Sequence, residues 1–240
     1  FMILGFWSRK VFFDYLGSEV VGLESTAGNL LGFLNLAELG IGMSVTYFLY
    51  KPLFSKDYEE INKIVALQGW IYRKVAYLVI GGAVVLMCFF PQIFHGMKLP
   101  MWYAYAIFGA FLFNSLLGYF INYRQIVLNT DQKGYKVTRV TTGVGVALKI
   151  LQIVMLPIVP SPFLFYVGTT LFSTVFSCWW LNRTIDKEYP WLKTTGYQGK
   201  KLLKAYPDVI KKTKQLFIHR ITSVLLFQGT PFIMYAFSTL

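Results

Sequence analysis

Charged residues are scarce in this sequence, and that scarcity argues against an ordinary soluble domain. Only 14% of the 240 residues are charged, whereas a soluble globular domain carries about 25%. Hydrophobic residues make up 55% of the chain, and the mean hydropathy is +0.51. Apolar stretches recur along the whole length, without a charged low-complexity tail. The composition therefore predicts one continuous all-α integral membrane domain.

Cysteine and histidine are also rare, with two residues of each. Cys88 and Cys178 lie inside apolar stretches, where a free thiol behaves as a small hydrophobe, so we expect neither a disulfide framework nor a metal site. His95 falls in a predicted loop and His219 at a predicted helix start, which leaves no evident paired base for catalysis. We expect no enzyme and no cofactor, with the identity of any coupling ion left open.

Acidic residues are outnumbered, since 11 Asp and Glu stand against 23 Lys and Arg, for a formal net charge of +12. Such a charge could indicate nucleic-acid binding. The basic residues, however, are concentrated between the apolar stretches, which is where membrane topology places them. We therefore expect no nucleic acid as a partner.

Apolar stretches separated by Gly, Pro and polar residues predict six full membrane spans after a partial first one. The partial span, Phe1 to Tyr15, holds too few apolar residues to cross about 30 Å of hydrocarbon. The full spans are predicted at residues 20–50, 64–90, 101–123, 137–159, 162–181 and 216–240.

Basic residues alternate between the predicted loops and indicate the orientation of the chain. The loops around Lys51, Lys133 and Lys200 contain sixteen Lys and Arg residues, whereas the alternate set contains only Lys98. Basic residues in short loops mark the cytoplasmic side of a membrane. The three basic loops and the amino terminus are therefore predicted to be cytoplasmic.

The third basic loop contains apolar residues at helical spacing opposite a face rich in lysine. This pattern predicts an amphipathic helix that lies on the anionic lipids of the inner leaflet. A solvated linker with helical content is the alternative.

Several charged residues fall within the predicted spans. A charge at mid-bilayer costs at least about 2.5 kcal/mol, so it normally faces a partner or a watery cavity. Arg9, Lys149 and Arg220, together with Lys10, are candidates for a cationic lumen that binds an anion through charge-assisted hydrogen bonds. Arg220 lies close enough to its helix start to reach the inner surface instead. The excess of cations argues against a cavity built for cationic drugs.

Two carboxylates also fall within the predicted spans. Glu24 and Glu38 are fourteen residues apart, which places them within about 40° of each other on one helix face. Two roles remain open for them: an ion pair with Lys149 or Arg9, or the coupling of transport to protons or other ions.

Glycine and proline interrupt two of the predicted helices. Gly40 and Gly42 follow Glu38, and Gly229 and Pro231 interrupt the span at 216–240. Such breaks in membrane helices predict hinges or binding sites. Close helix packing at the glycines is an equally good explanation.

Three segments carry a resemblance to a known family: DYLGSEVVGL at 14–23, LNLAELGIG at 34–42 and YFLYKPL at 47–53. They resemble the amino-terminal half of polysaccharide flippases of the O-antigen type, in the superfamily that also holds multidrug extruders and the lipid II flippase. The resemblance implies two helical lobes that work by alternating access. Applied to this chain, it implies a six-helix lobe over 1–181 with a truncated first helix, a basic cytoplasmic linker over 182–214, and the first helix of a second lobe over 215–240.

The resemblance also implies a function. The substrate would be an undecaprenyl-diphosphate-linked oligosaccharide, moved from the cytoplasmic to the periplasmic leaflet of a bacterial inner membrane, with other polysaccharide assembly proteins as further partners. Arg9 matches an Arg near the end of the family's first helix. The segment 228–231 stands where the family's seventh helix often carries an acidic residue, which argues against a coupling role for that helix. The alternatives are a cation-coupled multidrug antiporter of the same superfamily and a membrane-embedded glycosyl- or acyltransferase.

Overall fold

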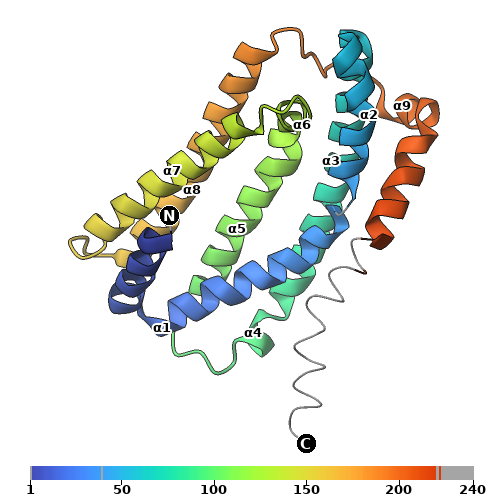
Figure 1. Ribbon diagram of the computed structural model, residues 1–240. Coiled ribbons are helices and arrows are strands. Elements are labelled where there is room, and N and C mark those ends of the chain that lie inside the picture. The colour runs from blue at the N-terminus through green and yellow to red at the C-terminus, as the bar shows by residue number, and fades with distance from the viewer. Residues whose placement is uncertain (1, 39, 220–221, 223–240) are drawn as a thin grey trace, which may run out of the picture.

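The computed structural model describes residues 2–38, 40–219 and 222, and within them it contains helices and loops but no strand (Figure 1). The longer helices are α1 (Met2–Asn35), α2 (Ile41–Ser55), α3 (Tyr58–Cys88), α5 (Trp102–Phe120), α7 (Gly134–Met155) and α8 (Pro162–Glu188). The shorter elements are η1 (Leu36–Glu38), α4 (Phe90–Ile93), η2 (Asn122–Gln125), α6 (Ile126–Thr130) and α9 (Gly199–Ala205). Residues 207–219 are also helical.

Four of these helices, α3, α5, α7 and α8, are long and apolar enough to cross a lipid bilayer. Large apolar side chains point outward from them: Phe172 and Trp179 of α8 are 70% and 56% exposed. Lipid is the solvent that suits such a surface. The prediction of an all-α membrane protein is therefore confirmed. The predicted count of six full spans is not confirmed, and most of the span predicted at 216–240 lies outside the described residues.

The first predicted loop is a kink within α1. Gly17 has φ 83° and ψ 159°, a conformation that glycine adopts readily because it has no Cβ. The two halves of α1 therefore point in different directions (Figure 1). Arg9 and Lys10 lie on the first half, and α1 as a whole packs mainly against α5 and α7.

The span predicted at residues 20–50 is divided in the structure. Helix α1 ends at Asn35, the 3-10 turn η1 follows, and α2 begins at Ile41. Gly40 lies in this break with φ 90°. A Cβ atom at Gly40 would come within 2.8 Å of the backbone nitrogen of Phe217, so glycine is required here both by the dihedral angle and by the close helix. Of the two predicted hinge pairs, this one coincides with a break, and Gly229 and Pro231 lie outside the described residues.

The three basic loops gather at one end of the molecule, the upper end in Figure 1. Salt bridges join the second of these loops to the third: Arg124 lies 2.8 Å from Asp186, and Lys133 lies 2.9 Å from Glu188. Glu188 also pairs with Lys136. At the other end, the backbone N–H of Leu99 donates to the carboxylate of Glu19 beside the α1 kink, at 3.2 Å. The loops rich in Lys and Arg thus lie at one end of the helices, and the alternate loops, which are poor in them, lie at the other end.

The segment predicted as a basic linker packs on the helices. Helix α8 continues to Glu188, past the predicted end at residue 181, and α9 and helix 207–219 follow. Leu202 and Val209 are 8% and 0% exposed and belong to the core around α2 and α3. The hydroxyl of Ser44 donates to the carbonyl of Val209 at 2.9 Å. Part of the apolar face predicted to lie on lipid is thus covered by protein, while the lysines of α9 stay exposed and contact with anionic lipid stays a prediction.

Candidate functional site

Lys149 lies half-buried on α7, within a helix long enough to span a membrane. Its ammonium nitrogen lies 4.6 Å from the centroid of the Phe12 ring, in a cation–π contact. Phe12 is buried and packs edge-on against Tyr166 of α8, with ring centroids 5.3 Å apart. The first half of α1 therefore supplies an aromatic face to Lys149, which is half-buried, whereas the other described candidates for the lumen, Arg9 and Lys10, are exposed.

Glu24 belongs to the same cluster. Its carboxylate is close enough to act electrostatically on both Lys149 and the hydroxyl of Tyr166. Across the described residues, no salt bridge joins Glu24 to Lys149 or to Arg9. The structure thus brings Glu24 within electrostatic range of Lys149, without the direct ion pair that was one of the two predicted roles.

The remaining lumen candidates are not brought together here. Arg9 and Lys10 are exposed on the first half of α1, and Arg220 lies outside the described residues. Two residues that sequence reasoning missed, Phe12 and Tyr166, form the surroundings of Lys149. Aromatic residues are so frequent in this chain, at 18%, that no local signal marked these two.

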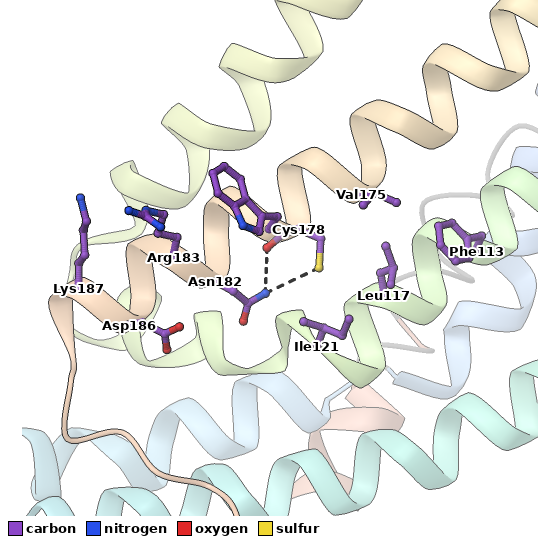
Figure 2. Close-up of a pocket in the computed structure, with 10 residues that line it drawn as sticks. Phe113, Leu117, Ile121, Val175, Cys178, Asn182, Arg183, Asp186 and Lys187 are labelled. Carbon is purple, nitrogen blue, oxygen red and sulfur yellow. Dashed lines mark hydrogen bonds between the residues drawn. The ribbon is translucent and has the colours of Figure 1, made fainter.

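A groove of about 740 Å³ runs between α5 and α8. Figure 2 shows Phe113 and Leu117 of α5 facing Val175 of α8 across it. Toward the carboxyl end of α8 the lining becomes polar: the side-chain nitrogen of Asn182 donates to the carbonyl of Cys178 at 2.9 Å. The groove is thus apolar between α5 and the middle of α8 and polar toward the carboxyl end of α8.

The polar end of the groove is cationic. Asp186 is paired with Arg124 at 2.8 Å, so its charge is compensated. Arg183 and Lys187 are exposed, and neither forms a salt bridge within the described part of the chain. The guanidinium of Arg183 lies 5.8 Å from the centroid of the Trp179 ring. Two uncompensated cations therefore stand where an apolar groove meets the basic end of the molecule. Sequence reasoning had counted them only as loop charges.

A second cavity, of about 360 Å³, lies at the break between α1 and α2. Its lining includes Glu38 of η1, Gln68 and Tyr72 of α3, and Tyr119 of α5. The Tyr72 hydroxyl donates to Glu38 Oε1 at 2.7 Å. Glu38, one of the two predicted coupling carboxylates, therefore lines a cavity.

His95 is exposed, and its Nδ1 lies 3.0 Å from the carbonyl oxygen of Gln92. Over the residues that the structure describes, no three His, Cys, Asp or Glu side chains lie close enough together to hold a metal ion.

The chain matches no family model, no curated protein and no solved structure. The resemblance to polysaccharide flippases therefore rests on the sequence motifs at 14–23, 34–42 and 47–53.

Proposed function

We propose that this chain forms the amino-terminal part of an alternating-access flippase, which moves an undecaprenyl-diphosphate-linked oligosaccharide from the cytoplasmic to the periplasmic leaflet. The observation that carries the proposal is the groove between α5 and α8, which is apolar along its length and cationic at one end. A lipid-linked oligosaccharide is an amphiphile with a long apolar tail and a diphosphate. The groove has an apolar stretch that suits the tail, followed by a cationic end that suits the diphosphate.

The cationic end suits the diphosphate. Arg183 offers a planar guanidinium and Lys187 a compact ammonium, and both form charge-assisted hydrogen bonds with phosphate oxygens. Basic pockets between membrane helices on the cytoplasmic side are a recurrent way to hold anionic lipid head groups. In the proposed orientation the basic loops are cytoplasmic. The cationic end would then lie in the leaflet from which the substrate is taken.

Lys149 gives independent support. A cation within a spanning helix costs at least about 2.5 kcal/mol on insertion scales, which favours a role that compensates for the cost. In the proposed mechanism Lys149, with Arg9, Lys10 and Arg220, offsets the lost hydration of the diphosphate as the substrate passes between the lobes. The tail stays in the bilayer, and rocking of the lobes reverses access.

One observation favours a second candidate, a cation-coupled multidrug antiporter of the same superfamily. Glu38 lines a cavity whose other lining side chains, among the described residues, include no basic one, and a carboxylate in such a place would suit an organic cation. The two candidates differ in the charge of the transported molecule, so a transport assay separates them.

The test is leaflet transfer of a fluorescent undecaprenyl-diphosphate oligosaccharide in proteoliposomes that contain the full-length protein. The double variant Arg183→Gln with Lys187→Gln should lose transfer, and Val175→Trp should lose it by filling the groove. Lys200→Gln removes an exposed cation of α9 outside the groove, and Leu164→Trp enlarges an outward side chain of α8 that is 60% exposed. Both controls should transfer normally. Failure of the wild-type protein to transfer the lipid, with cation-driven export of an organic cation instead, would favour the antiporter.

A further inference from the structure

The cavity at the break between α1 and α2 is lined by oxygen-bearing side chains from six elements, including Gln125 of η2 and Asn129 of α6. Asn35 comes from the end of α1, Glu38 from η1, Gln68 and Tyr72 from α3, and Tyr119 from α5. Among the described residues, its lining contains no Lys, Arg or His, although the chain as a whole has a net charge of +12. Within the described part of the chain, the cavity therefore holds one carboxylate, Glu38, and no cationic side chain that would compensate its charge.

The hydroxyl donors in this cavity are already used. Tyr72 donates to Glu38 Oε1 at 2.7 Å, and Tyr119 donates to Asn35 Oδ1 at 2.8 Å. The side-chain nitrogen of Asn35 donates to the Ser115 hydroxyl at 3.0 Å. A tyrosine hydroxyl carries only one hydrogen, so neither tyrosine can donate again to a second acceptor.

Gln68 is the group that this network leaves incomplete. It is 1% exposed, and its Oε1 is buried without a hydrogen-bond partner. It lines the same cavity as Glu38 and as Tyr72, whose hydroxyl is bonded to Glu38. A buried acceptor without a partner is destabilising, and native structures contain few of them. A positive ligand in the cavity would satisfy this oxygen and the carboxylate together.

We propose that this cavity binds a small alkali-metal cation, with the carboxylate of Glu38 supplying the charge and Gln68 Oε1 a neutral ligand. Carboxylate, amide and hydroxyl oxygens are the ligands that hard cations prefer. A single carboxylate balances a single positive charge, which favours a monovalent ion over a divalent one. The cavity volume of about 360 Å³ leaves room for water to complete the coordination.

The position of the site links it to the fold. Glu38 is two residues from Gly40, whose α-carbon packs against the backbone of helix 207–219 near Phe217. If the proposed flippase function holds, cation binding at Glu38 would bias the geometry of this break and so the movement of the helix that follows. The binding site itself does not depend on that function.

The test is thermal unfolding of the full-length protein in detergent, in NaCl or in choline chloride at equal ionic strength and at several pH values. A ligand that binds only the folded state raises the melting temperature with its concentration. We expect Na⁺ to raise it in the wild type and to lose this effect in Glu38→Gln and in Gln68→Met. Without Na⁺, Gln68→Met should be no less stable than the wild type, because it removes the unpaired oxygen.

Two matched variants control for structural damage. Gln152→Met replaces a second glutamine that is also 1% exposed, on α7 outside the cavity. Glu59→Gln removes an exposed carboxylate in the first turn of α3. Both should keep the full Na⁺ response. A wild-type melting temperature that responds to pH but not to Na⁺, Li⁺ or K⁺ would overturn the metal-ion site. Loss of lipid transfer with an intact Na⁺ response would count against the flippase and leave the cation site standing.

Discussion

Tyr72 of α3 donates a hydrogen bond of 2.7 Å to Glu38, across the break that separates α1 from α2. Glu38 belongs to a 3-10 turn whose neighbour Gly40 has a positive φ. Tyr72 is 6% exposed. This bond therefore joins α3 to the break between α1 and α2, where Glu38 lines a polar cavity.

We expect Tyr72→Phe to destabilise the protein by about 1.5 to 3 kcal/mol, because the carboxylate loses a buried hydrogen bond. Tyr77→Phe is the control, since Tyr77 lies on the same helix and is 62% exposed. Denaturant unfolding in detergent would compare the two. Equal effects of the two substitutions would contradict the role given to the Tyr72 bond.

We expect Gly40→Ala to cost about 1 to 3 kcal/mol, because alanine is strained at a positive φ. The added Cβ would also meet the backbone nitrogen of Phe217 at 2.8 Å. Gly81→Ala serves as the control, because a Cβ at Gly81 inside α3 meets nothing within 4 Å and alanine is the better helix former. The melting temperature should fall for the first variant and stay the same or rise for the second. A neutral Gly40→Ala would show that helix 207–219 does not pack on the break in solution.

Lys149→Met should make insertion of α7 into a bilayer more favourable by about 2.5 kcal/mol, because it removes a charge from the span. The same variant should lose leaflet transfer of the anionic lipid. Lys149→Arg keeps the charge and the cation–π contact with Phe12, so it should retain transfer. An insertion assay and the transport assay together separate these effects. A Lys149→Met protein that transports normally would remove Lys149 from the proposed path.

The loop cluster beyond the spans should give a pH-dependent stability. Burial opposes ionisation of Asp131, but hydrogen bonds from Lys133 and Tyr189 outweigh it and hold the pKa of this carboxyl below its ordinary value. Hydrogen bonds to Asp131 and Glu188 raise the pKa of Lys133. Asp131 therefore stabilises the fold above its unfolded-state pKa of 3.8, and that contribution is lost as the pH falls through the lowered folded pKa.

For Lys133 the sign is opposite. Its contribution is complete below the ordinary pKa of 10.5 and is lost as the pH rises through the raised folded value. Melting temperatures between pH 3 and pH 7 should fall less steeply for Asp131→Asn than for the wild type. Asp14→Asn, which changes an exposed residue of α1, should leave the slope unchanged. An unchanged slope in Asp131→Asn would show that this carboxyl is not stabilised in the folded protein.

The sequence by itself determined the class of the protein and the positions of several helix boundaries and kinks. Low charge and recurrent apolar segments are properties of the chain that need no tertiary contact, so they predicted a helical membrane protein. Pro162 begins α8 as predicted, because proline is favoured at a helix start. Gly17 lies in the first predicted loop, and in the structure it forms the kink at which α1 changes direction. Counting Lys and Arg separated the two sets of loops, since that pattern reflects the surroundings of each loop along the chain.

Only the tertiary structure decided which charged and polar groups meet. Folding brings Glu24 within electrostatic range of Lys149 and forms the hydrogen bond between Tyr72 and Glu38. It also places α5 beside the carboxyl end of α8. In each case the partners are far apart in the sequence. Periodicity along one helix gives the face on which a residue lies, but not which helix covers that face. The lone oxygen of Gln68 could not be found from the sequence for the same reason, because burial and a missing partner are properties of the packed helices.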